Sequence, residues 1–282
     1  MIKVLQTGFY SSIQDLGRFE FQKYGVPISG VMDMYSAKVA NAIVGNMEND
    51  AVLEITMTGP KLEFTDNTLI GLSGANISPM LNGKNVSINT AISLNKGDIL
   101  SFGRLKYGFR VYLAVSGGFQ TKQVLSSRSM YKNVTESISI SKGDVFEIKQ
   151  SNKEKRPSNA SIKIDKNHFN NNVIDVIKGP EFDKLTDYQA QQLLSSEFTI
   201  SRENSRMAYQ LEESLDNELD GIITSLVLPG TVQLTPSGKL IVLMRDCQTT
   251  GGYPRVLQLN GSSINRLSQK FTGQRIKFKL LD

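Results

Sequence analysis

Six carboxylate and arginine side chains that the sequence places in loops are the groups most suited to chemistry. They are Asp15, Arg18, Asp33, Arg206, Arg245 and Asp246. The forked guanidinium of an arginine can bind two oxygens of a planar carboxylate, ureido or phosphate group at once. A carboxylate beside it can accept a proton. This set therefore predicts a site for a small anionic or amide-like molecule.

A second candidate is the loop Thr249–Pro254, which follows the apolar run Leu240–Met244. Five apolar residues in a row predict a strand buried on both faces, and the loop begins where polar residues return. Gly251 and Gly252 would allow positive φ angles and a close approach of a ligand to main-chain amides. A plain turn between strands has the same sequence, so both interpretations stay open.

Several familiar catalytic patterns are missing from the sequence. It contains no P-loop, no Gly-x-Gly-x-x-Gly and no biotin-carrying Met-Lys-Met. His168, the single histidine, lies among polar residues and is expected to be solvated, and no Gly-x-Ser-x-Gly elbow supports a serine triad. The single cysteine, Cys247, excludes an internal disulfide and a thiolate metal site. We expect a core residue there, although Arg245 nearby leaves room for a reactive thiol.

The composition is that of an ordinary globular chain with room for two domains. The net charge is +5 over 282 residues, with 32 basic and 27 acidic side chains spread along the chain. Without a basic block interleaved with aromatics, we expect no nucleic-acid partner. No signal peptide and no apolar run near the ~20 residues of a membrane span are visible, so we expect no membrane partner and a cytoplasmic location.

The pattern of elements predicts a mainly β protein. Short alternating runs separated by Gly, Asn and Asp turns fill residues 51–148. Asp33 is well placed as the N-cap of a helix that ends near Gly45. Residues 7–30 are interpreted as a long ordered loop, and 182–194 as a helix. Glu54, within an apolar run, is either an outward residue of an alternating strand or a deliberately placed carboxylate.

A faint internal repeat suggests two similar units. Gly97 and Gly117 are 20 positions apart, Gly230 and Gly251 are 21 apart, and a strand-like run precedes each second glycine. The alternative is that glycine-turn-strand units look alike in any β protein. The polar stretch after Gln150 is the best boundary, which predicts domains at residues 1–155 and 156–282.

Eight motifs carry a resemblance to a known family. They are Ser12–Arg18, Gly25–Gly30, Met32-Asp33, Leu53–Thr56, Gly59-Pro60, Arg206-Met207, Pro229–Gln233 and Asp246–Pro254. With them the chain resembles the biotin-dependent carboxyltransferase family. That family includes the carboxyltransferase region of urea carboxylase (allophanate hydrolase subunit 2), the antagonist of a sporulation-kinase inhibitor, and the C subunit of 5-oxoprolinase. Ala208 and Gln210 stand where the family pattern has glycine and often arginine.

The resemblance implies an all-β fold with a few short helices, built as two cyclophilin-like β-barrel domains. A stand-alone chain of this length is most like the 5-oxoprolinase C subunit. Such a protein works with a kinase-inhibitor-like B subunit and with an A subunit, and the complex uses ATP to open 5-oxoproline to glutamate. The chain would then be inactive alone, share ATP with its partners and carry no covalently bound biotin. The alternatives are a urea-carboxylase-type carboxyltransferase subunit and a non-enzymatic antagonist that binds a kinase-inhibitor protein.

The site residues follow from the motifs and the resemblance together. The expected catalytic residues are Asp15, Asp33 and Arg206, and no metal ligands are expected. The expected substrate-binding residues are Gln14, Arg18, Ser29, Asp246, Thr249, Thr250, Gly251, Gly252 and Tyr253. We predict that Arg18, Asp33, Arg206 and Thr250 line one pocket between the domains. The alternative for Arg18 is that it pairs with Asp15 or Asp33 and pins the long loop.

Overall fold

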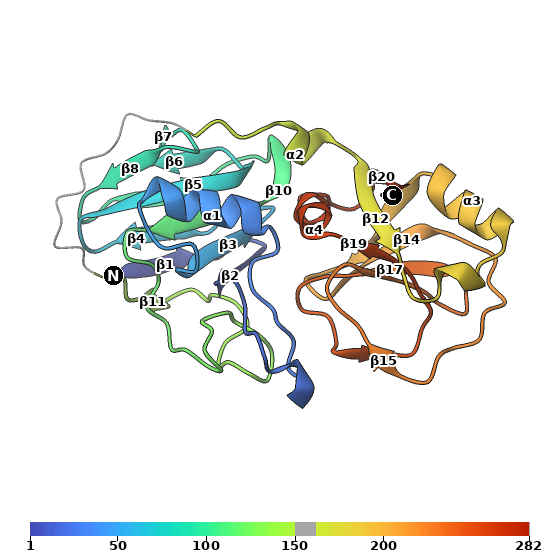
Figure 1. Cartoon of the computed structure of the whole chain (residues 1–282). Coiled ribbons are helices and arrows are strands. Elements are labelled where there is room, and N and C mark those ends of the chain that lie inside the picture. Colours follow the sequence, from blue (N-terminus) through green and yellow to red (C-terminus); the bar gives the residue numbers. More distant parts are fainter. Residues whose placement is uncertain (150–161, 282) are drawn as a thin grey trace. The chain divides into compact units, whose positions relative to one another are not determined.

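The computed structural model describes residues 1–149 and 162–281, which fall into two compact units (Figure 1). The first comprises Met1–Arg18 and Asp33–Phe169, and the second Phe19–Met32 and Asn170–Asp282. The domain boundary expected between residues 155 and 156 lies outside the described residues. The loop expected at residues 7–30 contributes to both units.

Two antiparallel sheets build the first unit. The six-stranded sheet has the order β11-β1-β4-β9-β6-β7, and the five-stranded sheet the order β2-β3-β10-β5-β8. The strands of the larger sheet are β1 (Ile2–Gln6), β4 (Lys61–Phe64), β6 (Pro79–Leu81), β7 (Lys84–Asn85), β9 (Ile99–Phe102) and β11 (Val145–Phe146). Those of the smaller sheet are β2 (Tyr10–Gln14), β3 (Val52–Thr56), β5 (Thr68–Asn76), β8 (Ala91–Leu94) and β10 (Tyr107–Val115). Residues 10–14 were expected to be loop and instead form β2.

One apolar cluster joins the two sheets. Ile2 and Phe64 come from the larger sheet, and Ile13, Leu53 and Leu113 from the smaller one. Successive side chains of a strand point to opposite faces, so the alternate residues of β2, β3 and β10 point away from this core. That second face of the smaller sheet carries the polar residues described below.

Helix α1 (Met34–Ile43) packs against β5 and β10, beyond the apolar core. It approaches the sheet closely at Gly71, where an added Cβ would lie 2.7 Å from the main-chain oxygen of Ala40. Only glycine leaves room for this packing. Asp33 is the N-cap of α1, as predicted, and its side chain accepts a hydrogen bond from Ser36 N. A short helix, α2 (Asn167–Asn170), ends the unit.

The second unit is a closed barrel in the order β12-β19-β16-β17-β14-β13-β20. Its strands are β12 (Val173–Lys178), β13 (Phe198–Asn204), β14 (Ala208–Ser214), β16 (Thr231–Leu234), β17 (Lys239–Leu243), β19 (Arg255–Leu259) and β20 (Arg275–Leu280). The pair β12–β20 is parallel and the other neighbours are antiparallel. A separate pair joins β15 (Ser225–Leu226) to β18 (Thr250–Gly251).

Short helices complete the second unit. They are η1 (Gln22–Tyr24), η2 (Phe182–Lys184), α3 (Asp187–Ser195) and α4 (Gly261–Ser268). The single helix expected at 182–194 is in fact two. Thr186 starts a new helix because its side chain accepts from Gln189 N and the Gln189 side chain accepts from Thr186 N, which is a capping box.

The predicted fold class is confirmed: the structure is mostly strands with a few short helices, and one unit is a closed seven-stranded barrel. The two glycine pairs of the faint repeat differ, however. Gly117 and Gly118 have φ of 85° and 73°, whereas Gly251 and Gly252 lack the expected positive φ. No helix in the described part of the chain is long and apolar enough to cross a bilayer.

Candidate functional site

Asp15 organises the segment 127–129 of the first unit. Its Oδ1 accepts hydrogen bonds from Ser127 Oγ and Ser129 Oγ, both at 2.7 Å, and from Gly17 N at 2.9 Å. Its Oδ2 accepts from Arg128 N at 2.7 Å. Three of these donors share Oδ1 and one binds Oδ2, so four hydrogen bonds anchor the carboxylate. The arrangement makes Asp15 a positioning residue for Arg128.

Gln14 and Arg18 bind the same segment from either side of Asp15. Gln14 Nε2 donates to Met130 O at 3.1 Å, and Arg18 donates to Ser129 O at 2.5 Å. Both side chains are fully buried. The three motif residues expected at a substrate are thus brought together, and their hydrogen bonds fix the loop that follows Thr121.

Asp33 lies at the start of α1 with three polar neighbours. Ser36 Oγ donates to its Oδ2 at 2.6 Å, and Asp33 N donates to Tyr112 Oη at 2.7 Å. His168 Nε2 lies 2.7 Å from the same Oδ2, with its side chain only 11% exposed. The expectation of a solvated histidine is therefore wrong, because the fold returns α2 to the N-terminus of α1. In this cluster the carboxylate stands between serine and histidine, unlike a serine triad, where the histidine stands in the middle.

A row of buried polar side chains crosses the smaller sheet beside Asp33. Ser12, Glu54, Tyr112 and Ser73 are directly opposite one another on β2, β3, β10 and β5. All four are fully buried. Glu54 therefore belongs to an internal polar face, with its Oε1 3.8 Å from the Nε of Arg110. Glu54 is thus the residue of its alternating strand that points away from the apolar core, and it is buried on that second face.

Burial raises the pKa of Tyr112 well above its ordinary value, and the nearby charges of Glu54 and Asp33 add to the effect. The phenol therefore stays protonated and can donate a hydrogen bond throughout the neutral range. Tyr112 was missed in the sequence because it lies in an apolar strand. A signal was available, because a buried tyrosine hydroxyl needs a hydrogen-bond partner and so indicates a nearby polar group.

Three expected site residues meet in the second unit. The guanidinium of Arg206 binds both oxygens of Asp246, from Nε at 2.8 Å and from a terminal nitrogen at 3.1 Å. The same arginine donates to Gly30 O at 2.6 Å, and Ser29 Oγ donates to Asp246 Oδ1 at 2.6 Å. Charge-assisted, forked bonds of this kind hold a planar geometry firmly. They tie the Ser29-Gly30 turn to the ends of β14 and β17.

The loop Thr249–Tyr253 is only partly a loop, because Thr250 and Gly251 form β18. Gly252 O accepts a hydrogen bond from Ile222 N at 2.9 Å. The reason for glycine at 251 is close packing: an added Cβ would lie 2.5 Å from Nε2 of the buried Gln233. Thr250 and Tyr253 are exposed.

Cys247 is a buried core residue, and burial raises the pKa of its thiol to about 12, with the Asp246 charge contributing. Such a thiol stays protonated, which removes the reactive interpretation. Among residues 1–149 and 162–281, no group of His, Cys, Asp and Glu is arranged to hold a metal ion.

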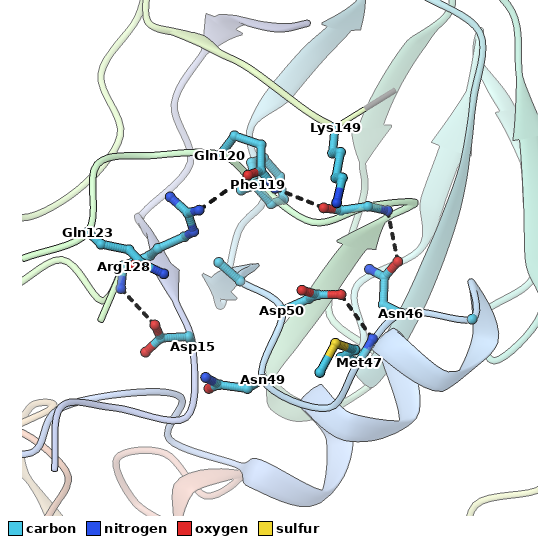
Figure 2. Close-up of a pocket in the computed structure, with 13 residues that line it drawn as sticks. Asp15, Asn46, Met47, Asn49, Asp50, Phe119, Gln120, Gln123, Arg128 and Lys149 are labelled. Atoms are coloured by element: carbon cyan, nitrogen blue, oxygen red, sulfur yellow. Dashed lines mark hydrogen bonds between the residues drawn. The ribbon is translucent and has the colours of Figure 1, made fainter. Parts of the chain in front are cut away.

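A cavity of about 450 Å³ opens in the first unit beside Asp15 (Figure 2). Arg128 and Asp50 reach into it, and Gln120, Asn49 and Lys149 also line it. Asp15 is the single expected site residue on its wall. Of the four residues predicted to share a pocket, Arg18 and Asp33 belong to the first unit and Arg206 and Thr250 to the second. Their common pocket stays a prediction.

A comparison with models of protein families assigns the chain to a family. A family model described as "carboxyltransferase domain, subdomain A and B" matches residues 24–280. The chain belongs to the carboxyltransferase domain family. The family resemblance inferred from the sequence motifs is confirmed.

Two relatives of this carboxyltransferase domain match over nearly its whole length, and a third matches over less than half of it. It is 32% identical to the 5-oxoprolinase C subunit of Escherichia coli over 99% of the chain and 90% of that protein. The 5-oxoprolinase C subunit of Haemophilus influenzae is 30% identical over 99% of the chain and 91% of its own length. The urea amidolyase of Lachancea kluyveri is 42% identical, but over 46% of this chain and 7% of its own length.

Solved structures share the fold. The crystal structure of TTHA0988 has a TM-score of 0.87 at 26% identity and covers 99% of the chain. This carboxyltransferase domain spans 55% of that protein, so it matches about half of it. The Kluyveromyces lactis urea amidolyase has a TM-score of 0.88 at 26% identity over the whole chain, which corresponds to 19% of that enzyme.

Proposed function

We propose that the chain is the C subunit of an ATP-dependent 5-oxoprolinase that opens 5-oxoproline to glutamate. The observation that carries the proposal is the match in length. Both relatives named as the C subunit of 5-oxoprolinase align with the chain from end to end and over nine-tenths of their own length. The urea amidolyase match covers less than half of the chain.

The proposed reaction needs an activated lactam. An amide is a poor electrophile, and transfer of a phosphoryl group from ATP to its oxygen, with release of ADP, makes the carbonyl carbon open to attack by water. When water has added, the ring C–N bond breaks, the nitrogen leaves as the protonated amine, and the acyl phosphate that remains is hydrolysed by a second water to glutamate and phosphate. ATP is a co-substrate here, and the absence of a P-loop in the sequence supports sharing it with the A and B subunits as partners. We propose that the chain works in the cytoplasm, is inactive alone, and carries no bound biotin.

Within this chain, the groups suited to proton transfer are Asp33 and His168. An imidazole N–H at Nε2 donates to Asp33 Oδ2 at 2.7 Å, which orients the ring and leaves Nδ1 as a second proton-accepting atom. Asp15, by contrast, accepts four hydrogen bonds from protein donors, which hold its carboxylate in the fold. Arg206 is held by Asp246 in a fixed plane, which suits an anion-binding group near the barrel.

The test is reconstitution with the two partner proteins. ATP-dependent release of glutamate from 5-oxoproline is measured with and without this chain. The proposal requires that the rate falls to background without it, and equal rates would overturn it. A cell that lacks this gene is expected to accumulate 5-oxoproline. If the chain instead transfers a carboxyl group from carboxybiotin to urea, the carboxyltransferase alternative replaces the proposal.

A further inference from the structure

The cavity beside Asp15 presents two cations and one available carboxylate to a ligand. Arg128 and Lys149 supply the positive charges, and Asp50 the negative one (Figure 2). The second carboxylate on the wall, Asp15, is turned toward the protein and accepts four hydrogen bonds from it, three of them on Oδ1. The wall is therefore complementary to a molecule with two negative groups and one positive group.

Arg128 is aimed into the cavity by its main chain. Arg128 N donates to Asp15 Oδ2 at 2.7 Å, which fixes the backbone independently of the side chain. One terminal nitrogen of the guanidinium donates to Gln120 Oε1 at 3.2 Å. Gln120 is in turn held by its Nε2, which donates to Gly117 O at 2.8 Å. Arg128 lines the cavity, and a guanidinium can bind a carboxylate through two oxygens.

Asp50 is fixed on the opposite side of the cavity. Its Oδ2 accepts a hydrogen bond from Met47 N at 2.9 Å, and its main-chain oxygen accepts from Asn41 Nδ2 at 2.8 Å. Within residues 1–149 and 162–281, no further hydrogen bond is made to its Oδ1. Figure 2 shows the carboxylate directed into the cavity. A half-buried carboxylate of this kind attracts an ammonium group.

Lys149 is an exposed residue on the wall of the cavity and supplies its second positive charge. The two residues before it are anchored by the bridge between Phe119 and Ile148 and by Gln120 N, which donates to Glu147 O at 2.9 Å. The cavity volume, about 450 Å³, lies within the roughly 300–1,000 Å³ of small-molecule sites.

We propose that this cavity binds an acidic α-amino acid, with its two carboxylates at Arg128 and Lys149 and its ammonium at Asp50. The charge pattern is independent of the proposed function. Only the choice of L-glutamate as the probe rests on that function, because glutamate is the product of the proposed reaction.

The experiment is calorimetric titration of the full chain with L-glutamate. Saturable binding is expected, weakened about tenfold or more in Arg128→Gln and in Asp50→Asn, as for the loss of one charge-assisted hydrogen bond. Both variants keep the fold: Arg128 is positioned by its main chain, and asparagine at 50 still accepts from Met47 N. Melting temperatures check this directly.

Matched control variants exist elsewhere in the chain. Asp144 accepts a hydrogen bond from Ser141 N at 2.7 Å, the same turn arrangement that Asp50 makes with Met47. Asp144→Asn and Arg104→Gln, which removes the charge of an exposed arginine, are expected to bind L-glutamate as the unaltered chain does. Glutarate, which lacks the ammonium, is expected to bind more weakly and to be insensitive to Asp50→Asn.

Three results would overturn the inference. The first is no saturation by L-glutamate at about 10 mM, and the second is a loss of affinity in the control variants equal to that in Arg128→Gln and Asp50→Asn. The third is inorganic phosphate that binds the unaltered chain as tightly as L-glutamate does and binds Asp50→Asn more tightly still. The last result would mark a simple anion site. Turnover by the assembled complex is a separate measurement, so binding without turnover would remove the proposed function and keep this site. Turnover by the complex without binding of L-glutamate to the chain would remove this site and keep the proposed function.

Discussion

His168 Nε2 lies 2.7 Å from Asp33 Oδ2, although 135 positions separate the two residues. The contact joins α2 to the N-terminus of α1, where the positive end of the helix dipole also favours a carboxylate. The same carboxylate thus caps a helix and orients an imidazole, and these two roles can be separated by mutation.

Asp33→Asn keeps an N-cap acceptor and removes the charge. We expect it to lower the free energy of unfolding by less than about 1 kcal/mol and to lower kcat of the reconstituted complex by about 10²-fold or more. Urea unfolding and the glutamate-release assay measure the two effects. Thr186→Ala, which removes the N-cap of α3, is the control and should lower stability alone. An unchanged kcat in Asp33→Asn would assign Asp33 a purely structural role.

Asp15→Ala is expected to be strongly destabilising. It leaves the hydroxyls of Ser127 and Ser129 and the N–H of Arg128 without their acceptor. Each buried, unsatisfied group costs about 1–3 kcal/mol, so the free energy of unfolding should fall by about 3 kcal/mol or more. Asp144→Ala, which removes one turn hydrogen bond at a half-exposed site, should cost less than about 1 kcal/mol. Equal losses in urea unfolding would contradict the central role of Asp15.

Lys270 should make stability rise with pH above 8. Burial lowers the pKa of its ammonium to about 8, with the charge of Arg266 contributing. Between this value and the ordinary pKa of about 10.4, the unfolded chain binds a proton that the folded chain does not, so the free energy of unfolding increases with pH. We expect an increase of about 1–2 kcal/mol after allowing for partial solvation. Lys270→Met should remove this pH dependence, which urea titrations at pH 8 and pH 10 measure. An equal rise in the free energy of unfolding of the variant between the two pH values would refute the role of Lys270.

Gly251 and Gly252 should respond differently to alanine. A Cβ at Gly251 would lie 2.5 Å from Gln233 Nε2, whereas at Gly252 the nearest atom, Ile222 O, would be 3.4 Å away. We expect Gly251→Ala to cost about 1–3 kcal/mol by overpacking and Gly252→Ala to be nearly neutral. Thermal unfolding of both variants compares them directly. A neutral Gly251→Ala would show that the Gln233 side chain moves aside at little cost.

Cys247 should be inert toward alkylation in the folded chain. A thiol with a pKa of about 12 carries roughly a thousandth of the thiolate of a free cysteine at pH 8, so reaction with iodoacetamide should be slower by that factor. The same chain in urea is the control and should react completely. Rapid modification of the folded protein, followed by mass spectrometry, would show an accessible thiolate and overturn the assignment to the core.

Local features of the fold were readable from the sequence because local physics sets them. Apolar runs and alternations predicted several strands of both units, and Asp33 was recognised as an N-cap because capping requires only a side-chain acceptor three residues before a free N–H. The glycine at 251 was noticed, but the packing around it was not predicted. Its cause is the side chain of Gln233 on another strand, which no local pattern reports.

The candidate site depended on contacts between distant segments. The motif residues Gln14, Asp15 and Arg18 looked like ligand-binding groups, yet their partners lie more than 100 positions away and leave Arg128 facing the cavity. His168 looked solvated because its sequence neighbours are polar. A side chain's burial and partners are set by which segments the tertiary fold brings together, whereas sequence periodicity reports only which face of its own element it occupies.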